Sequence, residues 1–121
     1  MTEQKFAQKR QFYRLKYPKR AMPVLQLGNQ RYRVTELSEQ GIRVLMENYS
    51  MMLKGEQMTG KVSLPTDDEI FIEGAVLRFD GEEVIFKLSK GPSFKIMVQE
   101  QRNIKNKFPH FYSLLRAQVV V

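Results

Sequence analysis

Short runs of alternating apolar and polar residues dominate the chain between residues 24 and 88. Alternation with a period of two is typical of strands that bury one face. Turn residues separate the runs, because Gly28-Asn29, Pro65 and Asp80-Gly81 each favour a change of chain direction. The runs are centred on residues 24–27, 32–35, 42–46, 62–64, 70–79 and 84–88. Six short strands at this spacing predict a small antiparallel β-barrel or β-sandwich.

The apolar period lengthens after Gly91-Pro92, where Ser93 is placed to cap a helix. Four apolar residues then recur at three-, seven- and four-residue steps, which places them on one helical face that packs on the strands. They are Phe94, Met97, Ile104 and Phe108. Glu100 and the nearby lysines and arginines are expected on the other faces. Pro109 ends this helix, and the apolar tail after it fits either more helix or a last strand.

Positive charge is concentrated at the N-terminal end of the chain. Residues 1–33 hold nine lysines and arginines and one acid, whereas the whole chain carries +7. Such a segment favours anionic partners, since its field attracts them. We expect residues 1–17 to form a basic arm that buries little, residues 18–91 to form the strand-rich core, and residues 92–121 to form the helix and tail of the same domain.

Several classes of protein are excluded by what the sequence lacks. The chain has no cysteine, which excludes disulfides and thiolate chemistry. No apolar run approaches the roughly 18 residues that cross a bilayer, and the N-terminus lacks a signal peptide. We therefore expect a cytoplasmic protein without a membrane span. Without a phosphate-binding glycine loop, a nucleophile elbow or histidines at metal-ligand spacing, we expect no enzyme, no catalytic residue and no metal.

The first candidate binding motif is Arg10-Gln11-Phe12-Tyr13-Arg14, which spaces two arginines as R-x-x-x-R. Each guanidinium can bind a phosphate or the O6/N7 edge of guanine in a bidentate manner, and its plane can stack on a base. Lysine supplies charge but neither the fork nor the plane. Taken alone, the motif is more typical of a solvated basic arm, because two arginines four residues apart are common.

The second candidate motif is Glu36-Leu37-Ser38-Glu39-Gln40-Gly41, which lies between two expected strands. A carboxylate here can accept hydrogen bonds from the N1-H and N2-H edge of guanine. The serine hydroxyl can bind phosphate or backbone, and the glycine permits a tight turn. Taken alone, this segment is more typical of a polar hairpin turn.

In their order and spacing, the two motifs resemble those of the PilZ domain family, in which R-x-x-x-R precedes the first strand and [D/N]-x-S-x-x-G follows at the second turn. Val76-Leu77-Arg78 and Glu83-Val84-Ile85-Phe86 resemble two of the family's later strands, so the resemblance covers about residues 9–108. It implies a six-stranded antiparallel β-barrel with a C-terminal α-helix. It also implies a cyclic di-GMP site on the outer surface of the barrel. The implied ligand-binding residues are Lys9, Arg10, Arg14, Glu36, Ser38 and Gly41. The family usually has Asp or Asn where this chain has Glu36.

The resemblance implies a bacterial second-messenger receptor that offers an unidentified protein effector a changed surface, in the regulation of motility or of biofilm. Two alternatives stay open at this stage. A PilZ-like adaptor would bind only protein and no nucleotide. A basic β-barrel would bind RNA or single-stranded DNA, with Tyr13, Tyr17 and Tyr32 as stacking platforms; the match to the two motifs makes nucleic acid the less favoured ligand.

Overall fold

The computed structural model describes residues 14–47 and 51–120. Seven strands, one short 3-10 helix and two α-helices follow one another in this part of the chain. The strands are β1 (Leu15–Lys16), β2 (Val24–Leu27), β3 (Gln30–Ser38), β4 (Gly41–Leu45), β5 (Gln57–Ser63), β6 (Glu69–Asp80) and β7 (Glu83–Lys90). The helices are η2 (Lys19–Ala21), α2 (Phe94–Lys107) and α3 (Pro109–Val120). The predicted turns are confirmed, and Gly28 and Gly81 have the positive φ values of 58° and 61° that these hairpins require.

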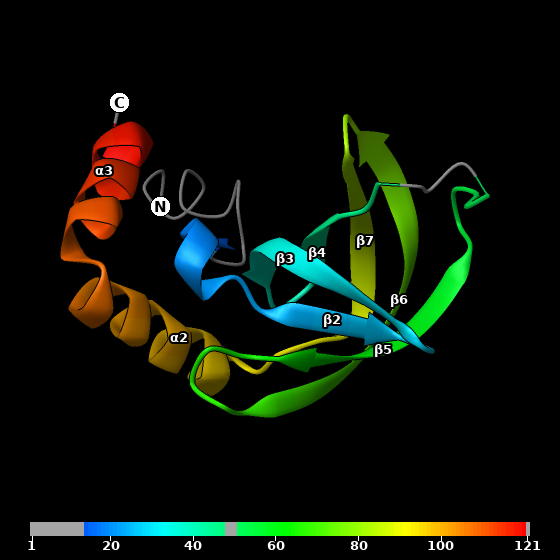
Figure 1. The fold of residues 1–121 in the computed structure, drawn as a ribbon, viewed down its shortest axis with the longest axis horizontal. Coiled ribbons are helices and arrows are strands. Elements are labelled where there is room, and N and C mark those ends of the chain that lie inside the picture. The colour runs from blue at the N-terminus through cyan, green and yellow to red at the C-terminus, as the bar shows by residue number, and fades with distance from the viewer. Residues whose placement is uncertain (1–13, 48–50, 121) are drawn as a thin grey trace, which may run out of the picture.

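Six of the strands close into an antiparallel barrel (Figure 1). They pair in the order β3-β2-β5-β6-β7-β4, and β4 pairs again with β3, which closes the ring. The predicted six-stranded barrel is therefore confirmed. Closure leaves no long unpaired strand edge in the ring. Irregular pairing between Val34 and Glu36, and at two places in β6, bends the long strands around the barrel.

The seventh strand is an addition that the sequence pattern did not predict. β2 pairs only with the first part of β3, and β1 occupies the same edge further along, with Leu15 opposite Leu37. Leu15 is fully buried and Tyr17 is 4% exposed. The expectation that the basic arm buries little is therefore wrong for these two residues, because the free edge of β3 and the core beneath it accept them.

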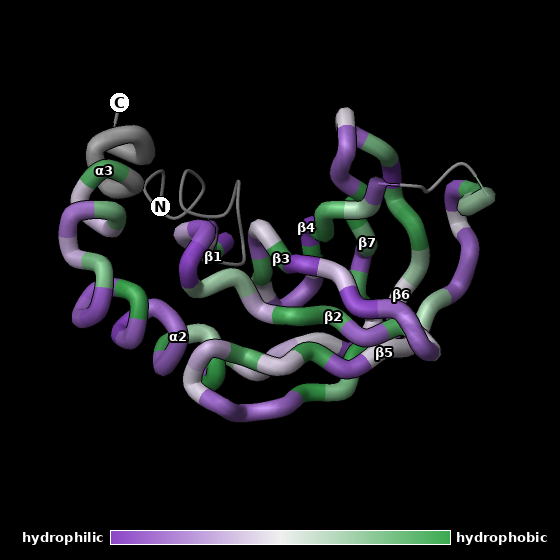
Figure 2. The backbone as a smooth tube through the Cα atoms, in the orientation of Figure 1, coloured by the Kyte–Doolittle hydropathy of each residue, from purple (hydrophilic) through white to green (hydrophobic). Residues whose placement is uncertain are grey.

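Alternate side chains of the strands fill the barrel. Figure 2 shows hydrophobic and hydrophilic positions alternating along the strands, as the sequence pattern predicts. Aliphatic residues and one phenylalanine with no exposed surface form the centre of the core. They are Leu25, Val34, Val44, Val62, Val84 and Phe86.

Helix α2 packs against the barrel beside the β5–β6 connection (Figure 1), and its Ser93 cap accepts a hydrogen bond from the Ile96 amide. Met97 and Ile104 are buried and Phe108 is partly buried, as predicted, but Phe94 is 69% exposed. The buried face is centred between Met97 and Glu100, and at about 100° per residue Phe94 lies about 90° from that centre. The placement of Phe94 was therefore wrong.

Glu100 was also predicted wrongly, because it is 1% exposed rather than on a solvated face. After α2, the Phe108 amide bonds to the Ile104 carbonyl, and Pro109 begins α3. The tail, for which helix and strand were both open, is thus helical through Val120. In the described part of the chain, no helix is long and apolar enough to cross a membrane.

Candidate functional site

The short strand β1 brings Arg14, the last residue of the arginine motif, to the second motif. β1 runs antiparallel to β3, and Lys16 lies opposite Glu36. Arg14, which directly precedes β1, therefore lies towards the β3–β4 turn, where Ser38 and Gly41 lie. Of the predicted ligand-binding residues, Lys9 and Arg10 lie outside the described residues. The structure brings the other four together at one end of β3.

Arg14 and Glu36 face each other across this junction. One guanidinium nitrogen of Arg14 lies 4.0 Å from the Oε1 atom of Glu36. The Arg14 side chain is 51% exposed and that of Glu36 is 16% exposed. An ion pair that is this long and this exposed contributes little to stability. Arg14 is therefore held loosely at the motif and can be drawn to another anion at small cost.

Ser38 and Gly41 form the tight turn between β3 and β4. Ser38 is 8% exposed, and its hydroxyl lies 3.5 Å from the Gly41 carbonyl oxygen that would accept its hydrogen bond. The Leu88 amide donates to the Gln40 carbonyl at 2.9 Å, which ties the turn to β7. Gly91 also approaches so closely that a Cβ there would lie 2.3 Å from the Glu39 carbonyl oxygen. Backbone contacts on two sides thus set the shape of this turn.

A second arginine on the barrel surface is already occupied. Arg43 lies opposite Glu36 in register, but its guanidinium binds Asp80 at 2.7 Å and Glu83 at 3.1 Å. The Thr35 hydroxyl donates to the same Glu83 at 2.6 Å. These side chains come from four neighbouring strands and hold the barrel together where β3 and β4 close it. Glu36 therefore keeps its negative charge available to Arg14.

A buried carboxylate lies near this junction, and the sequence analysis missed it. The Tyr17 hydroxyl donates to one carboxylate oxygen of Glu100 at 2.8 Å, and the Thr66 hydroxyl donates to the other at 2.8 Å. One signal was present, because Glu100 lies three residues after Met97 and four before Ile104, on the same helical stripe. Tyr17 is buried, so it cannot be one of the stacking platforms that the nucleic-acid alternative required.

Burial raises the pKa of the Glu100 carboxyl above its ordinary value of 4.5; hydrogen bonds from Tyr17 and Thr66 oppose the rise, and Asp68 adds to it. Burial, then Glu100, raises the pKa of Tyr17. Because folded Glu100 holds its proton more tightly than the unfolded chain does, its contribution to stability is complete below pH 4.5 and is lost as pH rises through the raised pKa.

Glu100→Gln should remove this pH dependence, since glutamine stays neutral. We expect the free energy of unfolding of the parent, relative to that of Glu100→Gln, to fall as pH rises above 4.5. Urea unfolding of both proteins at a series of pH values measures the difference. A difference that stays constant from pH 4.5 to pH 8 would contradict it.

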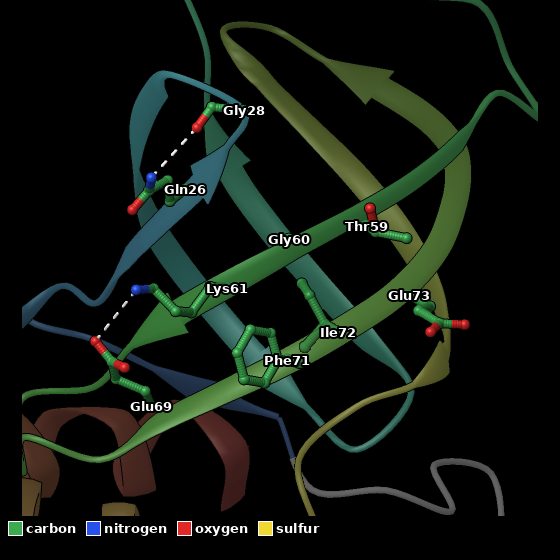
Figure 3. Close-up of a pocket in the computed structure, with 9 residues that line it drawn as sticks. All are labelled: Gln26, Gly28, Thr59, Gly60, Lys61, Glu69, Phe71, Ile72 and Glu73. Atoms are coloured by element: carbon green, nitrogen blue, oxygen red, sulfur yellow. Dashed lines mark hydrogen bonds and ion pairs between the residues drawn. The ribbon is translucent and has the colours of Figure 1, made fainter.

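A shallow hollow of about 460 Å³ lies elsewhere, on the outer face of β5 and β6 beside the β2–β3 turn (Figure 3). Phe71 on its wall is 70% exposed, and Lys61 and Glu69 form an ion pair of 3.5 Å there. The hollow contains neither of the two motifs. Among residues 14–47 and 51–120, no three histidine, cysteine or acidic side chains form a group that could hold a metal ion.

The family model of the PilZ domain matches residues 8–105. The chain belongs to the PilZ family. The match spans both motifs, the complete barrel and most of α2, so the predicted membership is confirmed. Within this PilZ domain, Arg14 and Glu36 lie on the outer side of the barrel at the β1–β3 junction. None of the curated protein sequences matches the chain.

Solved structures of PilZ proteins have the same fold. The PilZ domain with c-di-GMP of YcgR from Escherichia coli is 16% identical, with a TM-score of 0.60 over 83% of this chain and 97% of that chain. The Bacillus subtilis inhibitor of motility (MotI/DgrA) is 20% identical, with a TM-score of 0.59 over 84% of this chain. The present chain spans about half of the Bacillus protein, 53% of its length. At these identities the likeness shows the fold alone.

Proposed function

We propose that this PilZ protein is a receptor for cyclic di-GMP. The observation that carries the proposal is the meeting of Arg14 with Glu36 beside the Ser38–Gly41 turn, because it joins the two halves of the motif pair on one surface. Cyclic di-GMP offers two phosphates and two guanines. A guanidinium suits the phosphates or the guanine O6/N7 edge, and a carboxylate suits the guanine N1-H and N2-H edge. The E. coli structure with c-di-GMP supports the choice of ligand.

The charge of the surrounding surface supports an anionic ligand. Six exposed cations lie in or beside β1, η2 and β3. They are Arg14, Lys16, Lys19, Arg20, Arg31 and Arg33. A local excess of one sign raises the local concentration of a dianion and its rate of association. Lys9 and Arg10, which precede the described residues, would add to this excess.

The output would be a changed interaction with a protein effector, since PilZ domains are receptor and adaptor domains and not enzymes. Cytoplasmic location and a role in motility or biofilm stay predictions. The alternative is an adaptor that binds protein without nucleotide. One observation favours it, because the Arg14–Glu36 contact lets the motif neutralise its own charge in the absence of any ligand.

Calorimetric titration with cyclic di-GMP near physiological salt tests the proposal, with GTP and a short oligonucleotide as controls. We expect a dissociation constant of about 1 μM or tighter, which corresponds to roughly 8 kcal/mol. Absence of heat, together with absence of NMR shift changes at millimolar ligand, would leave the adaptor as the function. Equal or tighter binding of the oligonucleotide would point to nucleic acid instead.

Glu36→Asp should strengthen binding of cyclic di-GMP. Aspartate restores the residue usual in the family. Its shorter side chain moves the carboxylate away from Arg14, whose guanidinium nitrogen now lies 4.0 Å from the Glu36 Oε1 atom. Release of an exposed ion pair is worth about 0.2–1 kcal/mol, so the affinity should rise up to about five-fold. The same titration measures the change. Weaker binding by Glu36→Asp would mean that the ligand needs the longer reach of glutamate.

A further inference from the structure

The buried carboxylate of Glu100 joins three separate parts of the chain. It belongs to α2, and its two oxygens accept hydrogen bonds from Tyr17, which follows β1, and from Thr66, in the β5–β6 connection. Both bonds measure 2.8 Å, and Glu100 is 1% exposed. A carboxylate is costly to bury unless it is fully hydrogen-bonded. The position of Glu100, and with it that of α2, therefore depends on where the Tyr17 hydroxyl lies.

Tyr17 is linked just as closely to the proposed ligand site. It lies three residues after Arg14 in the chain, and its amide donates to the Thr35 carbonyl at 3.1 Å. Its side chain is buried, so it cannot turn away from α2 without opening the core. Arg14 and Tyr17 are thus the two ends of one short segment, Arg14–Tyr17, which backbone hydrogen bonds hold against β3.

Packing alone does not account for a glutamate at this position. Met97 and Ile104, on the same helical face, already attach α2 by apolar contacts. An apolar residue of similar volume is often as stabilising as a buried charged group. What the carboxylate adds is a requirement of position, since both its hydrogen bonds hold only in one arrangement of α2, β1 and the β5–β6 connection.

We infer that Glu100 is a positioning residue that couples the segment Arg14–Tyr17 to α2 through the Tyr17 hydroxyl. This inference rests on the proposed function, because the ligand is cyclic di-GMP at Arg14. When the ligand binds, Arg14 leaves Glu36 and the segment Arg14–Tyr17 shifts. The Tyr17 hydroxyl then changes its position relative to Glu100, and α2 shifts against the barrel. By reciprocity, the seating of α2 pre-organises the segment and sets the affinity for the ligand.

Three variants separate coupling from packing. Tyr17→Phe removes only the donor, and Glu100→Met keeps the length of the side chain but removes the acceptor. Glu100→Gln keeps a carbonyl oxygen for Tyr17 and serves as the rescue. Ile104→Val is the matched control, because it trims the same helical face without touching the hydrogen bonds.

We expect cyclic di-GMP to shift backbone NMR signals of α2 around Glu100 in the parent protein. These shifts should vanish in Tyr17→Phe and Glu100→Met, and the affinity of both should fall at least about five-fold. Glu100→Gln and Ile104→Val should keep the shifts and most of the affinity. If the parent binds the ligand while α2 signals stay unchanged, or if Tyr17→Phe behaves as Ile104→Val does, the coupling is overturned and the receptor function stands.

Failure of the receptor function gives a different result. If the parent binds no cyclic di-GMP, hydrogen exchange of the free protein decides the coupling. Glu100→Met should then speed exchange of the Tyr17 amide, which bonds to Thr35 on the far side of the segment, and Ile104→Val should not. An unchanged Tyr17 amide in Glu100→Met would overturn the coupling as well.

Discussion

Replacing Arg14 by alanine is expected to weaken cyclic di-GMP binding by about 1.5–3 kcal/mol, or roughly 10- to 150-fold. This range is that of a hydrogen bond to a charged group. Of the two motif arginines, Arg14 is the one that the structure describes, and it faces Glu36. The fold should be unaffected, because the side chain is half-exposed and its one ion contact is long. Calorimetric titration gives the affinity, and thermal unfolding checks the fold.

The lysine variant separates charge from geometry. Arg14→Lys keeps the positive charge but loses the fork and the stacking plane, so it should recover only part of the affinity. Arg10→Ala, which changes the first arginine of the motif outside the described residues, should lose affinity to a similar extent. Arg10 and Arg14 would then act together on one ligand.

Arg31→Ala is the matched control for a simple charge effect. Arg31 is also exposed and lies on β3, five residues before Glu36, about 17 Å along an extended strand. The Arg31→Ala variant removes the same charge without changing the β1–β3 junction, so it should lower the affinity for cyclic di-GMP by much less than Arg14→Ala. If Arg31→Ala and Arg14→Ala weaken binding equally, a diffuse field and not a site binds the nucleotide. If Arg14→Ala and Arg10→Ala both bind as tightly as the parent, the proposed site is wrong.

The barrel could be predicted from the sequence because most of its strands bury one face and alternate, as β4 and the middle of β6 do, and because turn residues separate the strands. β1 could not, because two residues carry no period. Leu15 is buried only because β2 ends its pairing with β3 early and leaves that edge open. This is a tertiary effect that overrides the basic composition of the segment.

The positions of the candidate site residues and of Glu100 could be predicted to different degrees. The resemblance to PilZ domains placed Arg14 and Glu36 at one site, and the structure brings them together. The burial of Glu100 could not be predicted, because its charge indicates a solvated face. Tyr17 and Thr66, the partners that make burial possible, lie 83 and 34 residues away in sequence. No local pattern encodes such contacts. Only the fold brings a tyrosine, a threonine and a glutamate together.

Phe86→Ala is expected to cost about 3–5 kcal/mol of unfolding free energy, the range for truncating a buried phenylalanine. Phe86 has no exposed surface and lies opposite Ile42 on one neighbouring strand and Val76 on the other. The loss would remove a large share of the 5–15 kcal/mol that holds a typical domain folded. Urea unfolding of parent and variant at one pH measures it.

Phe71→Ala is the matched control, because the same atoms are removed from a side chain that is 70% exposed at the outer face of β6. Its cost should stay within about 0.5 kcal/mol, as for most surface substitutions. The backbone of β7 at Phe86 also lies beside the second motif, since the Phe86 carbonyl oxygen would be 3.8 Å from a Cβ at Gly41. Phe86 lies opposite Ile42, the residue after Gly41, so a cavity at Phe86 should loosen the start of β4, and any folded Phe86→Ala should bind cyclic di-GMP more weakly than Phe71→Ala. Equal stability losses for the two phenylalanines would contradict the packing of the barrel, and equal affinities would separate the turn from the core behind it.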